Sequence, residues 1–229
     1  MLYNKYNLYH KRIMKMNIID LTHTISENMP VYPGTETPKL QPANTYEKDG
    51  FKETLMTMFS HTGTHMDPPA HLFEGRTTLD KFPINQFVGT ATVIECSELD
   101  EGGRITMEHI NKNKENADAA DFLLFHTGWD AHWGKDKYYG DYPFIDTEVA
   151  EYIVEHKKKG VGLDTIGLDP IRDINLTLHK MLLKENETVI IENLTNLGKI
   201  ERGLFTFIAL PLKHENADGS PIRAIAIIE

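Results

Sequence analysis

The segment His61–His71, with the sequence HTGTHMDPPAH, gathers side chains that bind metal ions and transfer protons. Three of the 11 histidines in the 229-residue chain fall within it, and Asp67 lies between the second and the third. Imidazole and carboxylate groups are ligands of catalytic zinc and also of manganese and iron, and without a cysteine the segment does not fit a structural zinc finger. The segment therefore predicts a metal site, in preference to a polar turn stabilised by hydrogen bonds.

The spacing of His61 and His65 matches that of helical zinc motifs, but the local backbone argues against a helix. Gly63 weakens a helix, and the two prolines that follow Asp67 would break it within a turn. The preceding residues 54–60, TLMTMFS, alternate as a strand does. We therefore expect a rigid turn at the end of that strand, which can direct several side chains toward one point.

A metal site of this kind needs further ligands from elsewhere in the chain, and two residues qualify. His179 follows GLDPIRDINLTL on a predicted helix, and Glu192 interrupts the apolar strand pattern VIIEN. An unpaired buried carboxylate is costly, so Glu192 needs a partner. A metal ion and an arginine are both suitable, and the strand pattern alone does not choose between them.

The periodicity of the chain predicts an α/β domain with a mixed, strand-rich sheet and helices packed on it. Helices are expected to begin near Thr106, at Asp146 with Gly160 as C-cap, and near Leu176. In the second of these, three lysines in the last turn would complement the helix dipole. Segments with the β-branched or alternating pattern of strands are 18–25, 54–60, 89–96, 121–127, 161–169, 187–194, 204–212 and 222–229.

A single domain over residues 16–229 is the simplest division of the chain, because no internal repeat or Gly/Ser-rich linker interrupts it. Residues 1–15 are basic and lack the continuous apolar core of a signal peptide. We expect them to be a disordered extension, arising from an upstream start codon or serving as a basic arm.

The composition of the chain argues against nucleic acid and membranes as partners. The formal net charge of −10 argues against a nucleic-acid-binding surface. No apolar run approaches the roughly 20 residues that a membrane span requires. The single cysteine, Cys96, cannot form an internal disulfide bond, so a cytoplasmic location and a buried, unreactive thiol are expected. A small molecule is the expected partner.

At these motifs the chain resembles the cyclase-like metal-dependent hydrolases, a family that includes bacterial kynurenine formamidase and isatin hydrolase. HTGTHMDPPAH is similar to the family signature H-x-G-T-H-x-D-x-P-x-H. IIDLTHTISENMPVYPG, HTGW, GLDTIGLDP and VIIENLTNL also occur in the order that this family shows. The resemblance implies a swivelling β/β/α fold and assembly into a homodimer or homotetramer.

The same resemblance implies roles for individual residues. Asp67 would bridge two metal ions, Glu192 would touch both, and His71 would be the general acid/base. Zinc is the expected metal, with one or two ions per chain, and manganese is the alternative. The metal ligands that the resemblance implies are His61, His65, Asp67, His179 and Glu192.

Two positions depart from the pattern of the family's formamidases. The formamidases carry W-P-G-D, with a tryptophan that contacts the aromatic substrate. This chain has YPGT at the same place, and its first residue, Tyr32, is expected to bind substrate. An arginine often precedes their T-G-W segment, and here the residue is His126. Further aromatic candidates for the pocket are Phe59, Trp129 and Trp133.

The sequence thus predicts an arylformamidase-like hydrolase that cleaves a non-peptide C–N bond in a small formamide or cyclic amide. Metal-activated water would attack the carbonyl, and a histidine would shuttle the proton. Two alternatives stay open. One is a cyclase or dehydratase that uses the same metal and base, and the other is a metal-binding protein without catalysis.

Overall fold

The structure is a computed structural model that describes residues 16–185 and 187–228. The expected extension at residues 1–15 lies outside the described residues. Within the described part, no helix is long and apolar enough to cross a membrane.

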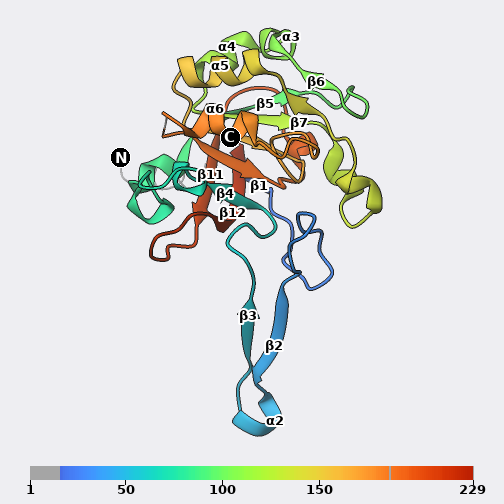
Figure 1. Cartoon of the computed structure of the whole chain (residues 1–229), viewed down its shortest axis with the longest axis vertical. Helices are drawn as coiled ribbons and strands as arrows, with labels where there is room; N and C mark the ends of the chain where they lie inside the picture. Colours follow the sequence, from blue (N-terminus) through green and yellow to red (C-terminus); the bar gives the residue numbers. More distant parts are fainter. Residues whose placement is uncertain (1–15, 186, 229) are drawn as a thin grey trace, which may run out of the picture.

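The main sheet closes into a barrel of seven strands (Figure 1). Around the ring the order is β12, β11, β5, β7, β9, β10 and β4, and β4 pairs again with the start of β12. The pairs β5–β7, β7–β9 and β9–β10 are parallel, and the other pairs of the ring are antiparallel. The strands of the ring are β4 (His65–Asp67), β5 (Val88–Glu95), β7 (Phe122–His126), β9 (Gly160–Leu163), β10 (Val189–Glu192), β11 (Phe205–Pro211) and β12 (Ser220–Ile228).

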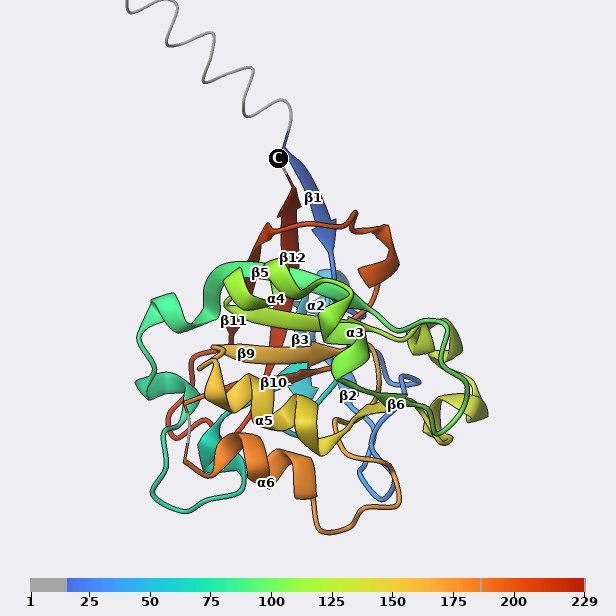
Figure 2. The same cartoon turned by 90° about the horizontal axis from the view of Figure 1, so that it is seen from above.

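Two shorter pairings complete the strands of the body. β1 (Asn17–Asp20) lies antiparallel to the C-terminal half of β12, as Figure 2 shows. β6 (Arg104–Ile105) and β8 (Phe144–Ile145) form a small parallel pair of their own. The mixed barrel with helices packed against it confirms the predicted α/β fold class.

Alternation along the strands separates two apolar clusters on the two faces of the sheet. On β7, Phe122 and Leu124 belong to the cluster inside the barrel, while Leu123 and Phe125 belong to the cluster under the helices. Gly160 on β9 packs directly against the ring of Phe122, which leaves no room for a side chain there. The barrel interior is therefore filled, and a binding site has to lie on the outer face or at a rim.

Helices cover the outer face of β7, β9 and β10. α5 and α6 contact each other along this side of the barrel (Figure 2). The side chain of Asp146 accepts a hydrogen bond from the backbone N–H of Val149 and caps α5, as predicted. The helices of the body are α3 (Met107–Asn111), α4 (Lys114–Ala119), α5 (Thr147–Glu155) and α6 (Thr177–Leu183).

The end of α5 differs from the prediction. The helix stops at Glu155, so the three lysines at 157–159 follow the helix instead of forming its last turn. Lys158 is buried, and its ammonium donates hydrogen bonds to the backbone oxygens of Ala117 and Ala120. A lysine expected in the last turn of α5 therefore joins the end of α4 to the segment that leads into β9.

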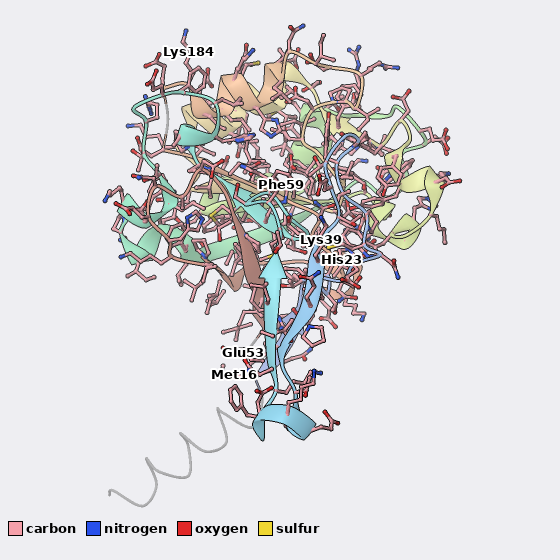
Figure 3. The ribbon with its side chains drawn as sticks, turned by 60° about the horizontal axis from the view of Figure 1, so that its bottom comes forward. Met16, His23, Lys39, Glu53, Phe59 and Lys184 are labelled. Carbon is pink, nitrogen blue, oxygen red and sulfur yellow. The ribbon has the colours of Figure 1, made fainter. Side chains whose placement is uncertain are left out.

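A long hairpin projects from the body (Figures 1 and 3). It consists of β2 (Lys39–Asn44), α2 (Tyr46–Asp49) and β3 (Glu53–Thr57), and every residue of β3 is exposed. The predicted strand at 54–60 therefore exists, but it belongs to this arm and not to the main sheet. In Figure 3, Glu53 lies toward the tip of the arm and Phe59 lies where the arm rejoins the body.

Candidate metal centre

The outer face of β4 and β10 carries the acidic part of the centre. Met66 points into the barrel, so its neighbours His65 and Asp67 point outward, toward the helices. Glu192 lies opposite His65 in the antiparallel register of β10 and β4, which brings it to the same face. The expectation of a turn here is wrong for these residues, because a three-residue strand holds them.

The turn before β4 positions His61 and fixes the orientation of His65. Gly63 has a positive φ of 66°, which a residue with a side chain adopts with difficulty. The carbonyl oxygen of Gly63 accepts a hydrogen bond from Nδ1 of His65 at 2.8 Å and from the side-chain amide of Asn193 at 3.0 Å. With Nδ1 engaged by this carbonyl, His65 directs Nε2 toward Asp67 and Glu192.

His179 reaches the centre from α6, which packs above β10. Asp169 holds this histidine in place: its carboxylate accepts a hydrogen bond from Nδ1 of His179 at 2.6 Å and from the backbone N–H of Leu178 at 2.7 Å. Tyr142, which is buried, donates its hydroxyl hydrogen bond to the backbone oxygen of Asp169 at 2.6 Å. Nε2 of His179 is thereby directed at the two carboxylates.

Asp67 and Glu192 each direct one carboxylate oxygen toward His65 and the other toward His179. Nε2 of His65 lies 3.3 Å from Oδ1 of Asp67 and 3.5 Å from Oε2 of Glu192. Nε2 of His179 lies 3.5 Å from Oδ2 of Asp67 and 3.3 Å from Oε1 of Glu192. The arrangement is therefore nearly symmetric, with one histidine on each side of a pair of carboxylates.

These separations fit a metal-binding donor set. Two donor atoms bound at about 2 Å to one tetrahedral ion lie about 3.3 Å from each other. The side chains of His65, Asp67 and Glu192 are all buried, and their donor atoms lie close enough together to hold an ion. Glu192 also accepts a hydrogen bond from the backbone N–H of Leu168 at 2.8 Å. Among the described residues, the groups in contact with this carboxylate are two imidazoles and a backbone N–H, which favours a metal ion over an arginine as its partner.

The carboxylates of the centre raise the pKa of two of its histidines. Burial alone would lower the pKa of His61, but the Asp67 carboxylate, which accepts its Nδ1 hydrogen bond at 2.7 Å, raises the pKa to about 9. Burial is likewise outweighed at His179, where hydrogen bonds to Asp169, Asp67 and Glu192 raise the pKa well above its usual range. Two buried carboxylates attract positive charge, which protons or a metal ion can supply.

His71 lies beside this group, on a single turn of 3-10 helix at Pro69–His71 that begins after Pro68. Its ring centroid is 4.0 Å from that of His61 and 6.2 Å from that of His179. Burial lowers the pKa of His71, so the ring is a neutral base at pH 7. Donor atoms of His61, Asp67 and His71 are also close enough together to bind one ion.

A cavity of about 660 Å³ opens onto the centre. Its walls include Tyr32 and Phe59, as predicted for the aromatic wall of a substrate pocket. All six residues expected to bind metal or transfer protons also line it, namely His61, His65, Asp67, His71, His179 and Glu192.

The other aromatic candidates lie elsewhere. Trp129 is buried, donates its indole N–H to the backbone oxygen of Tyr138, and lines a separate hollow. Trp133 stacks on His23 with ring centroids 3.7 Å apart. Neither tryptophan is among the described residues that line the large cavity, so the prediction that one of them faces the substrate is wrong.

One supporting residue was not predicted from the sequence. Asn193 follows Glu192 in a left-handed conformation with φ of 57°, and its side chain joins Gly63 to the hydroxyl of Tyr138. Its backbone oxygen accepts a hydrogen bond from Oγ1 of Thr64 at 2.6 Å. Asn193 thus ties β10 to the histidine-bearing turn. The only signal in the sequence is an asparagine directly after the strand, a residue type that tolerates positive φ.

Comparison with known proteins finds relatives over nearly the whole chain. Kynurenine formamidase from Bacillus cytotoxicus is 30% identical over 90% of this chain and 95% of its own length. A structure from Bacillus stearothermophilus, described as a "predicted metal-dependent hydrolase", is 28% identical over 93% of this chain and 98% of its own, with a TM-score of 0.70.

Isatin hydrolase A from Labrenzia aggregata shares the fold, with a TM-score of 0.83 at 24% identity over 99% of both chains. The model of the Cyclase family matches residues 19–170, which include the histidine-rich segment, Tyr32 and Asp169. On this match and on the similarity to the formamidases, the chain belongs to the Cyclase family.

Proposed function

We propose that this protein is a metal-dependent hydrolase that cleaves a small amide, most suitably a formamide on an aromatic ring. One observation carries the proposal: Asp67 and Glu192 are buried, and each turns one oxygen to His65 and the other to His179. An enclosed pair of carboxylates between two imidazoles is suited to bind two divalent ions. The similarity to kynurenine formamidases supports an amide as the substrate.

The ligand set favours zinc, with manganese as the alternative, because imidazole and carboxylate donors suit both ions. The residues that would hold the ions are His61, His65, Asp67, His179 and Glu192, with Nε2 of His65 and of His179 directed at the two carboxylates. A bound divalent ion would supply Lewis acidity, which polarises the amide carbonyl and lowers the pKa of a water molecule toward neutrality.

The remaining chemistry belongs to this chain's own residues. His71 accepts a proton from the attacking water and returns it to the leaving nitrogen, for which a neutral imidazole at pH 7 is suited. Tyr32 and Phe59 form the aromatic part of the cavity wall and would pack against the ring of the substrate. Asp169 and the carbonyl of Gly63 hold the imidazoles of His179 and His65 in position.

The first prediction concerns metal content and turnover. Protein purified without a tag or chelator should contain close to two zinc ions per chain and should hydrolyse formanilide and N-formylkynurenine. Chelation should abolish turnover, and adding back Zn²⁺ or Mn²⁺ identifies the working ion. Elemental mass spectrometry measures the metal content, and the mass of the product identifies the reaction. Gain of one water indicates hydrolysis, loss of one water indicates cyclisation, and a chain that takes up no metal contradicts the proposal.

The second prediction separates His71 from the metal ligands. His71→Ala should lower kcat by about 10²–10⁴-fold, because a general acid/base is removed, while the metal content stays unchanged. His179→Ala is the matched comparison and should lose metal together with activity. If His71→Ala loses metal as well, His71 is a ligand, as its closeness to His61 and Asp67 allows.

The third prediction follows from the raised pKa of His61, about 9, and of His179. Below pH 9 the apoprotein holds protons that a metal ion must displace, so zinc binding at pH 7 should release at least one proton per chain. Apparent affinity should rise about tenfold per pH unit for each displaced proton, and the contribution of His61 should level off above about pH 9. Titration calorimetry in buffers of different ionisation enthalpy measures the release. Equal heats in all buffers would contradict it.

We also propose that the protein forms a homo-oligomer, a homodimer or homotetramer, through the β2–β3 arm. A two-stranded hairpin alone is marginally stable in water, and every residue of β3 in this one is exposed. Its exposed apolar side chains, each about half exposed or more, are Tyr46, Phe51, Leu55 and Met56. Contact with a second copy would bury them and stabilise the hairpin.

The fourth prediction tests the arm. Leu55 and Met56 are adjacent on β3, so they point to opposite faces of the hairpin. Leu55→Asp or Met56→Asp, whichever lies on the docking face, should shift the mass from oligomer to monomer in size-exclusion chromatography with light scattering. Glu53→Ala on the same strand is the control and should leave the mass unchanged. A monomeric unsubstituted protein would contradict the proposal.

A further inference from the structure

We propose that Asp218 is a positioning residue for His61, held over the imidazole by the loop between β11 and β12. The inference rests on the metal-binding role proposed above for His61, and it adds a residue outside the histidine-rich segment, β10 and α6. Asp218 lies 157 residues from His61 in the chain, and both line the same cavity.

The two nitrogens of the His61 ring face two different carboxylates. Nδ1 lies 2.7 Å from Oδ1 of Asp67, on the side of the buried centre. Nε2 lies 3.4 Å from Oδ2 of Asp218, on the side of the cavity mouth. The Asp67 side chain is buried, whereas that of Asp218 is 55% exposed. His61 thus has an inner partner that shares the proposed metal and an outer partner that does not.

The loop that carries Asp218 is anchored on both sides of this residue. On one side, Ala217 is buried; its backbone N–H donates to Oδ1 of Asp80 at 3.2 Å, and its oxygen accepts from the N–H of Leu79 at 3.0 Å. On the other side, Ser220 begins β12 and pairs with Met66 of β4. The position of Asp218 is therefore set from both sides, by Leu79 and Asp80 on one side and by the barrel on the other.

Gly219 gives a second sign that this loop is built around His61. A β-carbon added at Gly219 would lie less than 3 Å from three atoms of the His61 ring, so no side chain fits there. Gly219 is buried, and its φ is not positive. The close approach of the ring, and not a turn, accounts for a glycine at this position.

The base of the arm also contributes to this contact. Oγ of Ser60 donates a hydrogen bond to Oδ2 of Asp218 at 3.4 Å, the same oxygen that faces Nε2 of His61. The Asp218 carboxylate is thus held between the hydroxyl of Ser60 and the imidazole of His61, which are neighbours in the chain after β3.

A histidine that binds a metal through one nitrogen commonly donates its other N–H to a carboxylate or a carbonyl. This outer partner selects the tautomer, orients the ring and makes the ligand more basic. His65 has the Gly63 carbonyl in this role, and His179 has Asp169. For His61, Asp218 supplies the corresponding acceptor, so each of the three imidazoles has an outer partner of its own.

The test is a zinc-affinity titration, by competition with a chromogenic chelator, of the full chain and three variants. Asp218→Ala should weaken zinc binding about 10- to 100-fold, the usual cost of losing such a partner. Asp218→Asn should lose less, because its amide oxygen can still accept the N–H. Glu215→Ala removes the same charge from the same loop and should bind zinc as the unsubstituted chain does. Melting of the metal-free variants should be unchanged, because the Asp218 side chain is more than half exposed.

A spectroscopic readout separates positioning from a merely structural effect. With Co²⁺ in place of zinc, Asp218→Ala should change the visible absorption band, which reports ligand geometry, while Glu215→Ala should not. Unchanged affinity and spectrum in Asp218→Ala would overturn the inference and leave the metal site standing. Loss of a whole equivalent of metal would also overturn it, because Asp218 would then be a ligand. Failure of the unsubstituted chain to bind zinc or Co²⁺ would overturn both proposals.

Discussion

The structure of the centre depends on one electrostatic constraint: Asp67 and Glu192 are buried side by side and must be matched by positive charge. Burying a carboxylate without a partner costs several kcal/mol. Backbone N–H groups and imidazoles supply part of the compensation, and the imidazoles are held by further acceptors of their own. Neighbouring carboxylates raise the pKa of His61 and of His179, so without a metal these imidazoles carry protons in the place where a divalent ion would supply the charge.

Because the two carboxylates must be matched by positive charge, the side chains of the centre need fixed positions, which a closed barrel provides. β4 contributes only three residues, yet its pairing with both β10 and β12 fixes which face each side chain takes. A slip of one residue would send His65 and Asp67 into the apolar interior and bring Met66 out. Closure of the ring prevents that slip, and α6 then supplies His179 from above. The rigidity of the barrel is what makes a pair of carboxylates with matched distances to two histidines possible.

The sequence predicted the residue types of the site better than it predicted their geometry. Ligand candidates were found because histidine clusters and a carboxylate in an apolar strand are unusual. The strand at His65–Asp67 was missed because three residues between a glycine and two prolines give no readable period. The alternation at 54–60 predicts a strand but not its place, since an exposed hairpin such as β3 (Glu53–Thr57) alternates in the same way as a buried strand. Asn193 and Gly63 both depend on a positive φ and on hydrogen bonds that involve the backbone, which side-chain patterns do not reveal.

The arm and the cavity are physically connected, although the apolar residues of the arm lie far from the metal centre. Residues before β2, including Tyr32 and Thr35, and residues after β3, including Phe59 and Ser60, all line the cavity. Both ends of the hairpin therefore enter the cavity wall, and His61 follows Ser60 directly. Whatever fixes the orientation of the arm also fixes the aromatic wall and the approach to His61. The proposed assembly and the proposed substrate recognition would consequently share one structural element, so a change in the arm would reach the site through the backbone itself.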